Sequence, residues 1–94
     1  GQLGIDPRTG DMPMSFEAQA NLVFNHIKSI LDAASMGFAH VVKVTVYLDD
    51  MNHFSLLNDI YTRNFSAPFP AREVVEVSRL PKDAMIEIAV IAMK

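Results

Sequence analysis

Two segments with helical spacing of apolar residues alternate with short stretches rich in β-branched residues, and this order leaves few folds open to a 94-residue chain. In residues 16–35 apolar side chains recur every three or four positions, with Ser15 placed to cap the helix and Gly37 placed to end it. Residues 52–65 repeat the pattern, and Asn58 falls on their apolar stripe. The spacing therefore predicts two amphipathic helices.

The remaining segments are typical of strands. Residues 40–48, HVVKVTVYL, are followed by two aspartates and predict a strand with one buried face, formed by Val42, Val44, Val46 and Leu48. Residues 72–78 and 85–92 predict two more strands, joined as a hairpin through RLPKDA, and the opening GQLGIDPRTGD predicts a strand end followed by a turn. Layer packing then predicts an α+β sandwich with both helices on one face of a sheet of four or more strands.

The sheet face away from the helices is predicted to need a cover of its own. The strands carry Val, Met and Ile on that side as well as on the helix side. A chain of this length buries only about 60–65% of its unfolded surface, so a subunit interface adds much to its stability. We therefore expect a homo-oligomer.

Composition narrows the range of partners and locations. The net charge is -3 and the charged residues are scattered, which disfavours nucleic acid and anionic membranes as main partners. The absence of cysteine excludes disulfides, thiolate ligands and a cysteine nucleophile. No apolar run approaches the roughly 18–20 residues of a membrane span. We expect a cytoplasmic or organellar protein without a membrane partner, whose natural chain begins before Gly1.

A carboxylate interrupts the apolar stretch AMIEIAVIAM at Glu87, where the pattern favours Val or Ile. A buried carboxylate needs a proton, a cationic partner or a purpose such as holding a water. Arg72, at the entry to the strand that follows PFPA, is the best candidate partner. The two residues either form a structural ion pair, or Arg72 binds a small carboxylate while Glu87 holds a water or moves a proton. The sequence leaves open whether they meet within a subunit or across an interface.

The other polar candidates are weaker. Asn58 is expected either to bond a backbone carbonyl or to line a pocket at a subunit contact. His26, His40 and His53 have no spacing that places two of them on one face, so no metal site is predicted. No nucleophile elbow, Walker loop or dinucleotide-binding loop occurs. On these grounds the chain is an oligomeric α+β domain with a candidate anion pocket.

A family resemblance adds to this interpretation. The segments VVKVTVYLDDMNHFSLLNDIYTRNF and FPAREVVEVSRLPKDAMIEIAVIA, with GQLGIDPRTGD at the start, closely resemble the Rid family, also called YjgF or L-PSP, whose archetype is a reactive intermediate (enamine/imine) deaminase. The resemblance covers essentially the whole chain and implies one Rid-type domain over residues 1–94 that lacks the N-terminal strands of the family. It also implies a chorismate-mutase-like fold with a mixed sheet, assembled as a homotrimer with its sites in the clefts between subunits.

The resemblance implies roles for individual residues. Arg72 of the PAR motif would bind the substrate carboxylate, and Glu87 of the IEI strand would position the attacking water. Asn58 matches the helix Asn of the family, and Gly1 matches the glycine of its GQ motif. The implied reaction hydrolyses small 2-imino carboxylates to 2-keto acids and ammonia, as a 2-iminobutanoate/2-iminopropanoate deaminase does, without metal or organic cofactor.

Two positions depart from the deaminase pattern, and two other functions compete with it. Val74 stands where many members have a Cys, which makes any ligand contact there apolar, and Ala89 replaces a second Glu.

The family is also described as an L-PSP endoribonuclease that inhibits translation. The acidic balance and the lack of aromatic residues interleaved with basic ones argue against that function. A third alternative is a non-catalytic trimer that binds small carboxylates.

Overall fold

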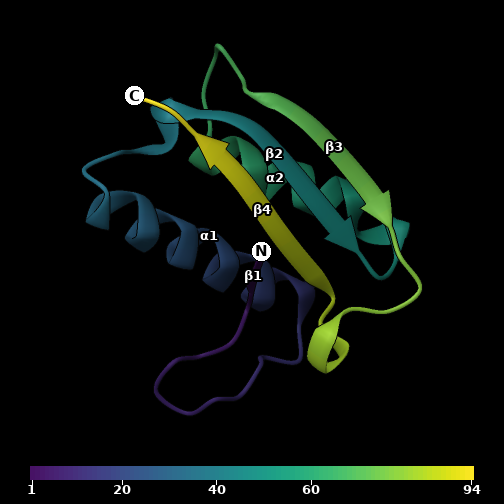
Figure 1. Ribbon diagram of the computed structural model, residues 1–94. Helices are drawn as coiled ribbons and strands as arrows, with labels where there is room; N and C mark the ends of the chain where they lie inside the picture. The colour runs from purple at the N-terminus through teal and green to yellow at the C-terminus, as the bar shows by residue number, and fades with distance from the viewer.

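The computed structural model describes residues 1–94 and contains two helices and a four-stranded sheet (Figure 1). The elements in chain order are β1 (Gln2–Leu3), α1 (Phe16–Ala33), β2 (Val41–Leu48), α2 (Phe54–Asn64), β3 (Ala71–Glu76) and β4 (Ile86–Ala92). Short 3-10 turns precede β2, α2 and β4. The predicted order of elements and the α+β class are confirmed.

The start of α1 follows its sequence signal and its end does not. The Ser15 hydroxyl accepts a hydrogen bond from the Ala18 backbone N–H at 3.2 Å, as an N-cap should. At the other end, Ser35 takes the left-handed conformation with φ of 59°, and the Met36 N–H donates to the Leu31 carbonyl at 2.8 Å. Gly37 is extended, with φ of -134°, so the prediction that it ends the helix is wrong.

The sheet has the strand order β1-β4-β2-β3, which corrects the predicted hairpin. β3 pairs parallel with β2, and β4 pairs antiparallel with β2 on the other side, so β2 separates the two C-terminal strands. The parallel pairing arises because α2 is the crossover between β2 and β3 and buries its apolar face on the way. The nine residues 77–85 then carry the chain past β2 to its far side.

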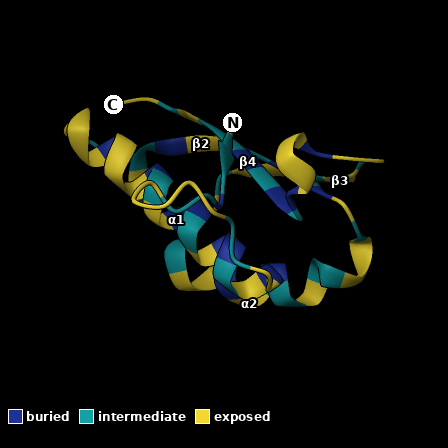
Figure 2. Ribbon diagram, turned by 90° about the horizontal axis from the view of Figure 1, so that it is seen from below, coloured by how far each residue is buried: buried dark blue, intermediate teal, exposed yellow.

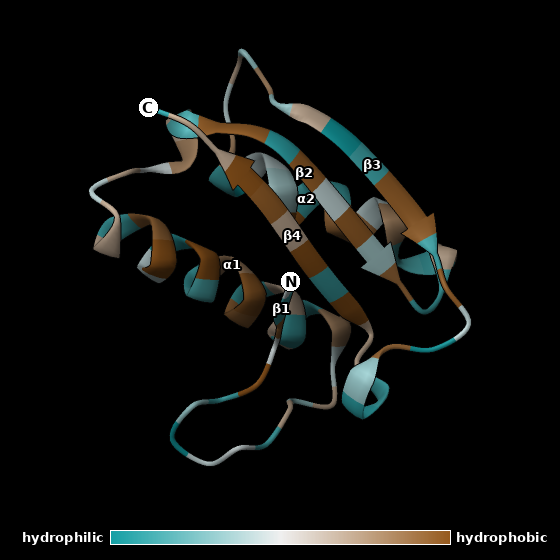
Figure 3. Cartoon of the chain, in the orientation of Figure 1, coloured by the Kyte–Doolittle hydropathy of each residue, from teal (hydrophilic) through white to brown (hydrophobic).

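Both helices lie on the same side of the sheet, as predicted, and the core fills the space between the layers (Figure 2). Val44, Val46 and Leu48 of β2 are fully buried against the helices. Val42 is 45% exposed and Val41 is buried, contrary to the predicted alternation, because a bulge between Val41 and Lys43 shifts the register. The apolar character of β2 and β4 is visible in Figure 3.

The other sheet face is uncovered in the single chain. Residues paired across neighbouring strands share a face, and the register assigns these to the open face: Leu3, Lys43, Thr45, Tyr47, Ala71, Glu73, Val75, Glu87, Ala89 and Ile91. Lys43 and Glu73 form an ion pair of 3.0 Å there, while Val75 and Ile91 remain 42% and 56% exposed. The expectation of an unpartnered second face is thus confirmed for the chain alone. Neither helix is long and apolar enough to cross a membrane.

Candidate functional site

Arg72 lies near the start of β3, at one edge of the sheet. It pairs in register with Val44, whose side chain is buried under the helices, so Arg72 also projects toward the helix layer. Its guanidinium has no carboxylate within ion-pair distance. A cation without a charged partner at an exposed edge is available to an anionic ligand.

One face of α2 holds the guanidinium. Phe54, Asn58 and Tyr61 follow one another at helical spacing, and Arg72 reaches all three. Its Nη1 donates to the Asn58 Oδ1 at 2.7 Å. Its Cζ lies 4.8 Å from the centre of the Tyr61 ring and 5.7 Å from that of Phe54, within the range of cation–π attraction. We call Phe54, Asn58 and Tyr61 the arginine cradle.

A hollow of about 250 Å³ opens beside the cradle. Its walls are Asn58, Tyr61, Thr62, Phe69, Pro70 and Arg72. Phe69 is 54% exposed and contributes an apolar side chain to the walls. Because Asn58 engages only one of the five N–H donors of a guanidinium, donors remain for a carboxylate in the hollow. The arrangement suits a small planar acid.

Tyr61 is buried, with 4% of its surface exposed, and its hydroxyl has no hydrogen-bond partner in the chain. Burial raises the pKa of the phenol above its ordinary value, and the neighbouring Arg72 charge lowers it by less. The ring therefore stays neutral at physiological pH and presents its π face to Arg72.

Glu87 lies on the other face of the sheet. It pairs with Leu3 of β1 and Tyr47 of β2, is half-buried, and takes part in none of the chain's ion pairs. Gly1 lies against it so closely that a Cβ at Gly1 would overlap the Glu87 carboxylate. A side chain at position 1 would therefore have to displace the flexible Glu87 carboxylate.

The structure separates Arg72 from Glu87 within one chain. Arg72 aligns with Val90 across β2, and Glu87 is three residues from Val90 on the opposite face. Two strand spacings and three residues along the strand place their Cα atoms about 14 Å apart, with the sheet between their side chains. The structural ion pair is therefore absent within one chain, and a meeting of the two residues across an interface stays a prediction.

The other candidates are placed as follows. Asn58 bonds Arg72 rather than a backbone carbonyl, and it lines the hollow. That this hollow lies at a subunit contact stays a prediction. Val74 shares the face of Arg72 but packs against the core and does not line the hollow. Ala89 lies beside Glu87 on the open face. A contact of either Gly1 or Val74 with a ligand stays a prediction.

The three histidines have structural contacts. His26 Nε2 hydrogen-bonds the Ile5 carbonyl at 2.7 Å, and His40 Nδ1 accepts from the Gly37 N–H at 3.0 Å. The His53 ring stacks on Phe16 with centroids 4.4 Å apart. No three histidine or carboxylate side chains gather in one place.

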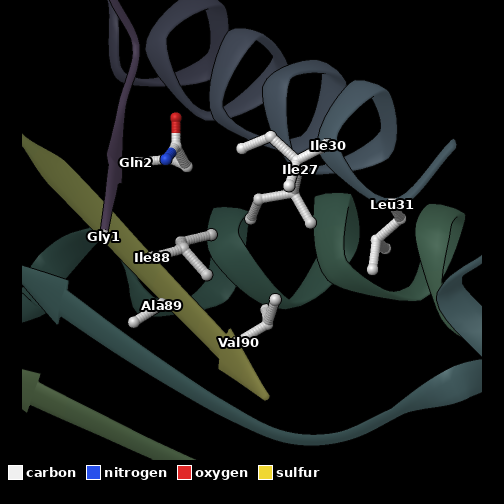
Figure 4. A pocket seen from close by; sticks show the side chains of 8 residues that line it. All are labelled: Gly1, Gln2, Ile27, Ile30, Leu31, Ile88, Ala89 and Val90. Carbon is white, nitrogen blue, oxygen red and sulfur yellow. The ribbon is translucent and has the colours of Figure 1, made fainter. Parts of the chain in front are cut away.

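A second hollow, of about 180 Å³, lies between α1 and β4 beside the N-terminus (Figure 4). Ile27, Leu31, Ile88 and Val90 point toward one another across it, and it has no charged side chain in its lining. It contains neither Arg72 nor Glu87. It offers apolar contact without a group that binds or activates a polar ligand.

Sequence reasoning missed the aromatic half of the arginine cradle. The helical spacing of residues 52–65 places Phe54 and Tyr61 on the predicted apolar stripe, which is correct for the mostly buried Tyr61 ring but omits its contact with Arg72. The signal was present, because positions 54, 58 and 61 flank Asn58 by four and three residues. Thr62 and Phe69 carry no comparable signal.

The fold and site define a class of protein: a small α+β sandwich with an uncovered sheet face and a candidate carboxylate-binding arginine at its edge. The sequence profile described as Endoribonuclease L-PSP matches residues 1–94. A RutC family protein of Pyrococcus horikoshii is 50% identical over 95 residues, covering the whole chain and 75% of that protein. The 2-iminobutanoate/2-iminopropanoate deaminase of Escherichia coli is 42% identical over 97 residues, covering the whole chain and 76% of that protein.

Solved structures agree. The crystal structure of RidA from an Antarctic Psychrobacter species superposes with a TM-score of 0.94 at 44% identity, covering 98% of this chain and 75% of that one. Escherichia coli TdcF with bound serine gives a TM-score of 0.94 at 37% identity, covering 100% and 76%. The chain belongs to the L-PSP family, which includes the RidA and RutC proteins, and the resemblance seen in its sequence is confirmed.

Proposed function

We propose that the protein hydrolyses reactive 2-imino carboxylates, such as those formed from 2-aminoacrylate, to 2-keto acids and ammonia. The observation that carries the proposal is the Arg72 guanidinium, held by the arginine cradle without a carboxylate partner and facing a hollow of about 250 Å³. The name of the 42% identical E. coli relative supports the same reaction.

The chemistry needs one anchor and one group that handles water. Arg72 anchors the ligand carboxylate through its free N–H donors. Glu87 accepts a proton from a water as the oxygen adds to the imine carbon, and returns that proton to the imine nitrogen to give an adduct with a hydroxyl and an amino group. In the collapse of this adduct the hydroxyl proton moves to the amino nitrogen, the C–N bond breaks as the C=O bond forms, and ammonia leaves the keto acid. Imines also hydrolyse in free water, so the barrier that the protein has to lower is modest. Positioning of the substrate and of the water, together with proton transfer, is sufficient for this.

The two halves of this site must come from different chains. Arg72 with Asn58 forms one half on the helix side of β3, and Glu87 with Gly1 forms the other on the open face. A small ligand spans both only where one chain's β3 edge meets another chain's open face. A homotrimer with a site at each contact provides this arrangement and also covers Val75 and Ile91, which are exposed in the single chain.

The test is keto-acid release from freshly generated 2-aminoacrylate above the uncatalysed rate. We expect acceleration by the protein, its loss in Arg72→Ala, and its retention in Arg79→Ala, a matched arginine variant whose side chain makes only an exposed ion pair with Asp83. Equal acceleration by both variants would remove Arg72 from the reaction.

A non-catalytic carboxylate-binding protein is distinguished by Glu87→Gln. The deaminase proposal predicts that this variant loses turnover yet still binds pyruvate, because the anchor is untouched. Full turnover in Glu87→Gln would contradict the role of its carboxylate. Pyruvate binding without any turnover in the wild-type protein would leave binding as the function.

The description of the matching family keeps ribonuclease activity as a second candidate. Binding through phosphates would weaken steeply with salt, so RNA cleavage and binding measured over a range of ionic strength test it directly. We expect neither, given the net charge of -3.

A further inference from the structure

We infer that Tyr61 is a positioning residue, whose ring fixes the orientation of the Arg72 guanidinium and thereby sets the affinity for the ligand carboxylate. The inference deepens the proposed function and rests on it, since it assumes that Arg72 is the carboxylate anchor. It assigns a task to a residue whose ring centre lies 4.8 Å from the Arg72 Cζ, and which otherwise belongs to the core and to the wall of the hollow.

The guanidinium is constrained at two points. Asn58 Oδ1 accepts from Nη1 at 2.7 Å and fixes one end of the planar group. The Tyr61 ring below Cζ limits rotation about that hydrogen bond. An arginine at an exposed sheet edge would otherwise sample many rotamers, and each ligand would have to stop that motion on binding. The two contacts together pre-organise the anchor.

The choice of an aromatic ring also leaves the donors free. Attraction between a cation and a π face uses no N–H group, whereas a carboxylate partner would occupy two. Asn58 takes one donor of Arg72, and the ring takes none. The guanidinium thus keeps a fork of in-plane donors for a planar carboxylate, which a lysine at the same place would not offer.

The ring itself is held by the core. Its centroid lies 4.6 Å from that of Phe65 in a stacked contact, and 6.4 Å from that of Phe24 in an edge contact. On the hollow side the exposed Phe69 ring lies 6.4 Å away. Tyr61 therefore cannot follow the guanidinium if Arg72 moves, so it can serve as a fixed platform.

The experiment compares pyruvate affinity by calorimetry with the KM and kcat for 2-aminoacrylate. In Tyr61→Leu we expect pyruvate affinity to fall about tenfold and KM to rise similarly, with kcat within about twofold of the wild-type value. Tyr61→Phe keeps the ring and should restore affinity to within about twofold. Phe38→Leu, an aromatic change in the same cluster, is the matched control for a general loosening of the core.

A double-mutant cycle separates positioning from structural damage. If the ring acts by orienting the guanidinium, Tyr61→Leu should weaken binding in the wild-type background and weaken it much less in the Arg72→Lys background, which keeps a charged anchor but has no planar group to orient. Equal weakening in both backgrounds, or wild-type affinity in Tyr61→Leu, would overturn the inference. If Tyr61→Leu does not fold, Phe54→Leu, which removes the ring at 5.7 Å, should raise KM about threefold, and an unchanged KM would count against the cradle.

The outcome for the proposed function remains separate. Loss of pyruvate binding in Arg72→Ala with normal binding in Tyr61→Leu would refute the positioning role alone. Wild-type pyruvate binding in Arg72→Ala would refute the carboxylate anchor, whatever the Tyr61 variants do.

Discussion

Mixing two inactive variants should restore activity if the proposed site is shared between chains. The perturbation is Arg72→Ala in one chain and Glu87→Gln in the other, co-expressed in equal amounts so that the oligomers contain both. Each variant alone lacks one half of every site. In a mixed oligomer some contacts pair the intact Arg72 of one chain with the intact Glu87 of its neighbour.

The expected magnitude follows from the geometry. Within one chain the two residues lie on opposite faces of the sheet, about 14 Å apart at Cα, so one small ligand does not reach both. Each site then takes residue 72 from one chain and residue 87 from a different chain, and each of these two residues is intact with a probability of about one half. About one quarter of the sites, and about one quarter of wild-type keto-acid release, should therefore be recovered.

The control replaces the Glu87→Gln chain by the Arg72→Ala, Glu87→Gln double variant, which supplies no intact arginine and should restore nothing. Mass spectrometry of the intact complexes confirms that mixed oligomers have formed. If they form and release keto acid no faster than the separate variants, the reasoning from opposite sheet faces is refuted.

Three further predictions concern single positions. Gly1→Ala should lower turnover roughly tenfold or more while leaving the melting temperature nearly unchanged, because the new methyl group displaces the flexible Glu87 carboxylate. Gly4→Ala should lower the free energy of unfolding by about 1–3 kcal/mol in denaturant titrations, because its Cβ would lie 2.5 Å from the Gln19 backbone oxygen. The raised pKa of Tyr61 means that the folded state holds the phenol proton more tightly than the unfolded state does. The stability that this difference contributes is complete below about pH 10, where the phenol is protonated in both states, and it is lost as pH rises through the folded pKa. Tyr61→Phe should therefore lose less stability above pH 10 than the wild-type protein; an equal loss would show that Tyr61 does not cause it.

The site shows where sequence reasoning succeeds and where it stops. Arg72, Glu87 and Asn58 were identifiable because each is a polar residue in a pattern that favours an apolar one, or stands at a rigid strand entry. That Asn58 bonds Arg72, and that Glu87 does not, depends on which strand lies beside which. The alternation of apolar and polar residues shows which side chains of a strand share a face, but it does not show which strand lies next to it in the sheet.

The same division holds for the fold. Local spacing determined the two helices, the cap at Ser15 and the extended segments, because helical and strand periods are properties of consecutive residues. Only the tertiary structure decided that β3 returns parallel to β2, that a bulge exposes Val42, and that Arg72 and Glu87 face opposite ways. These outcomes depend on burying the apolar face of α2 and on pairing backbone groups between distant segments. Such long-range interactions cannot be inferred from the pattern of any short stretch of sequence.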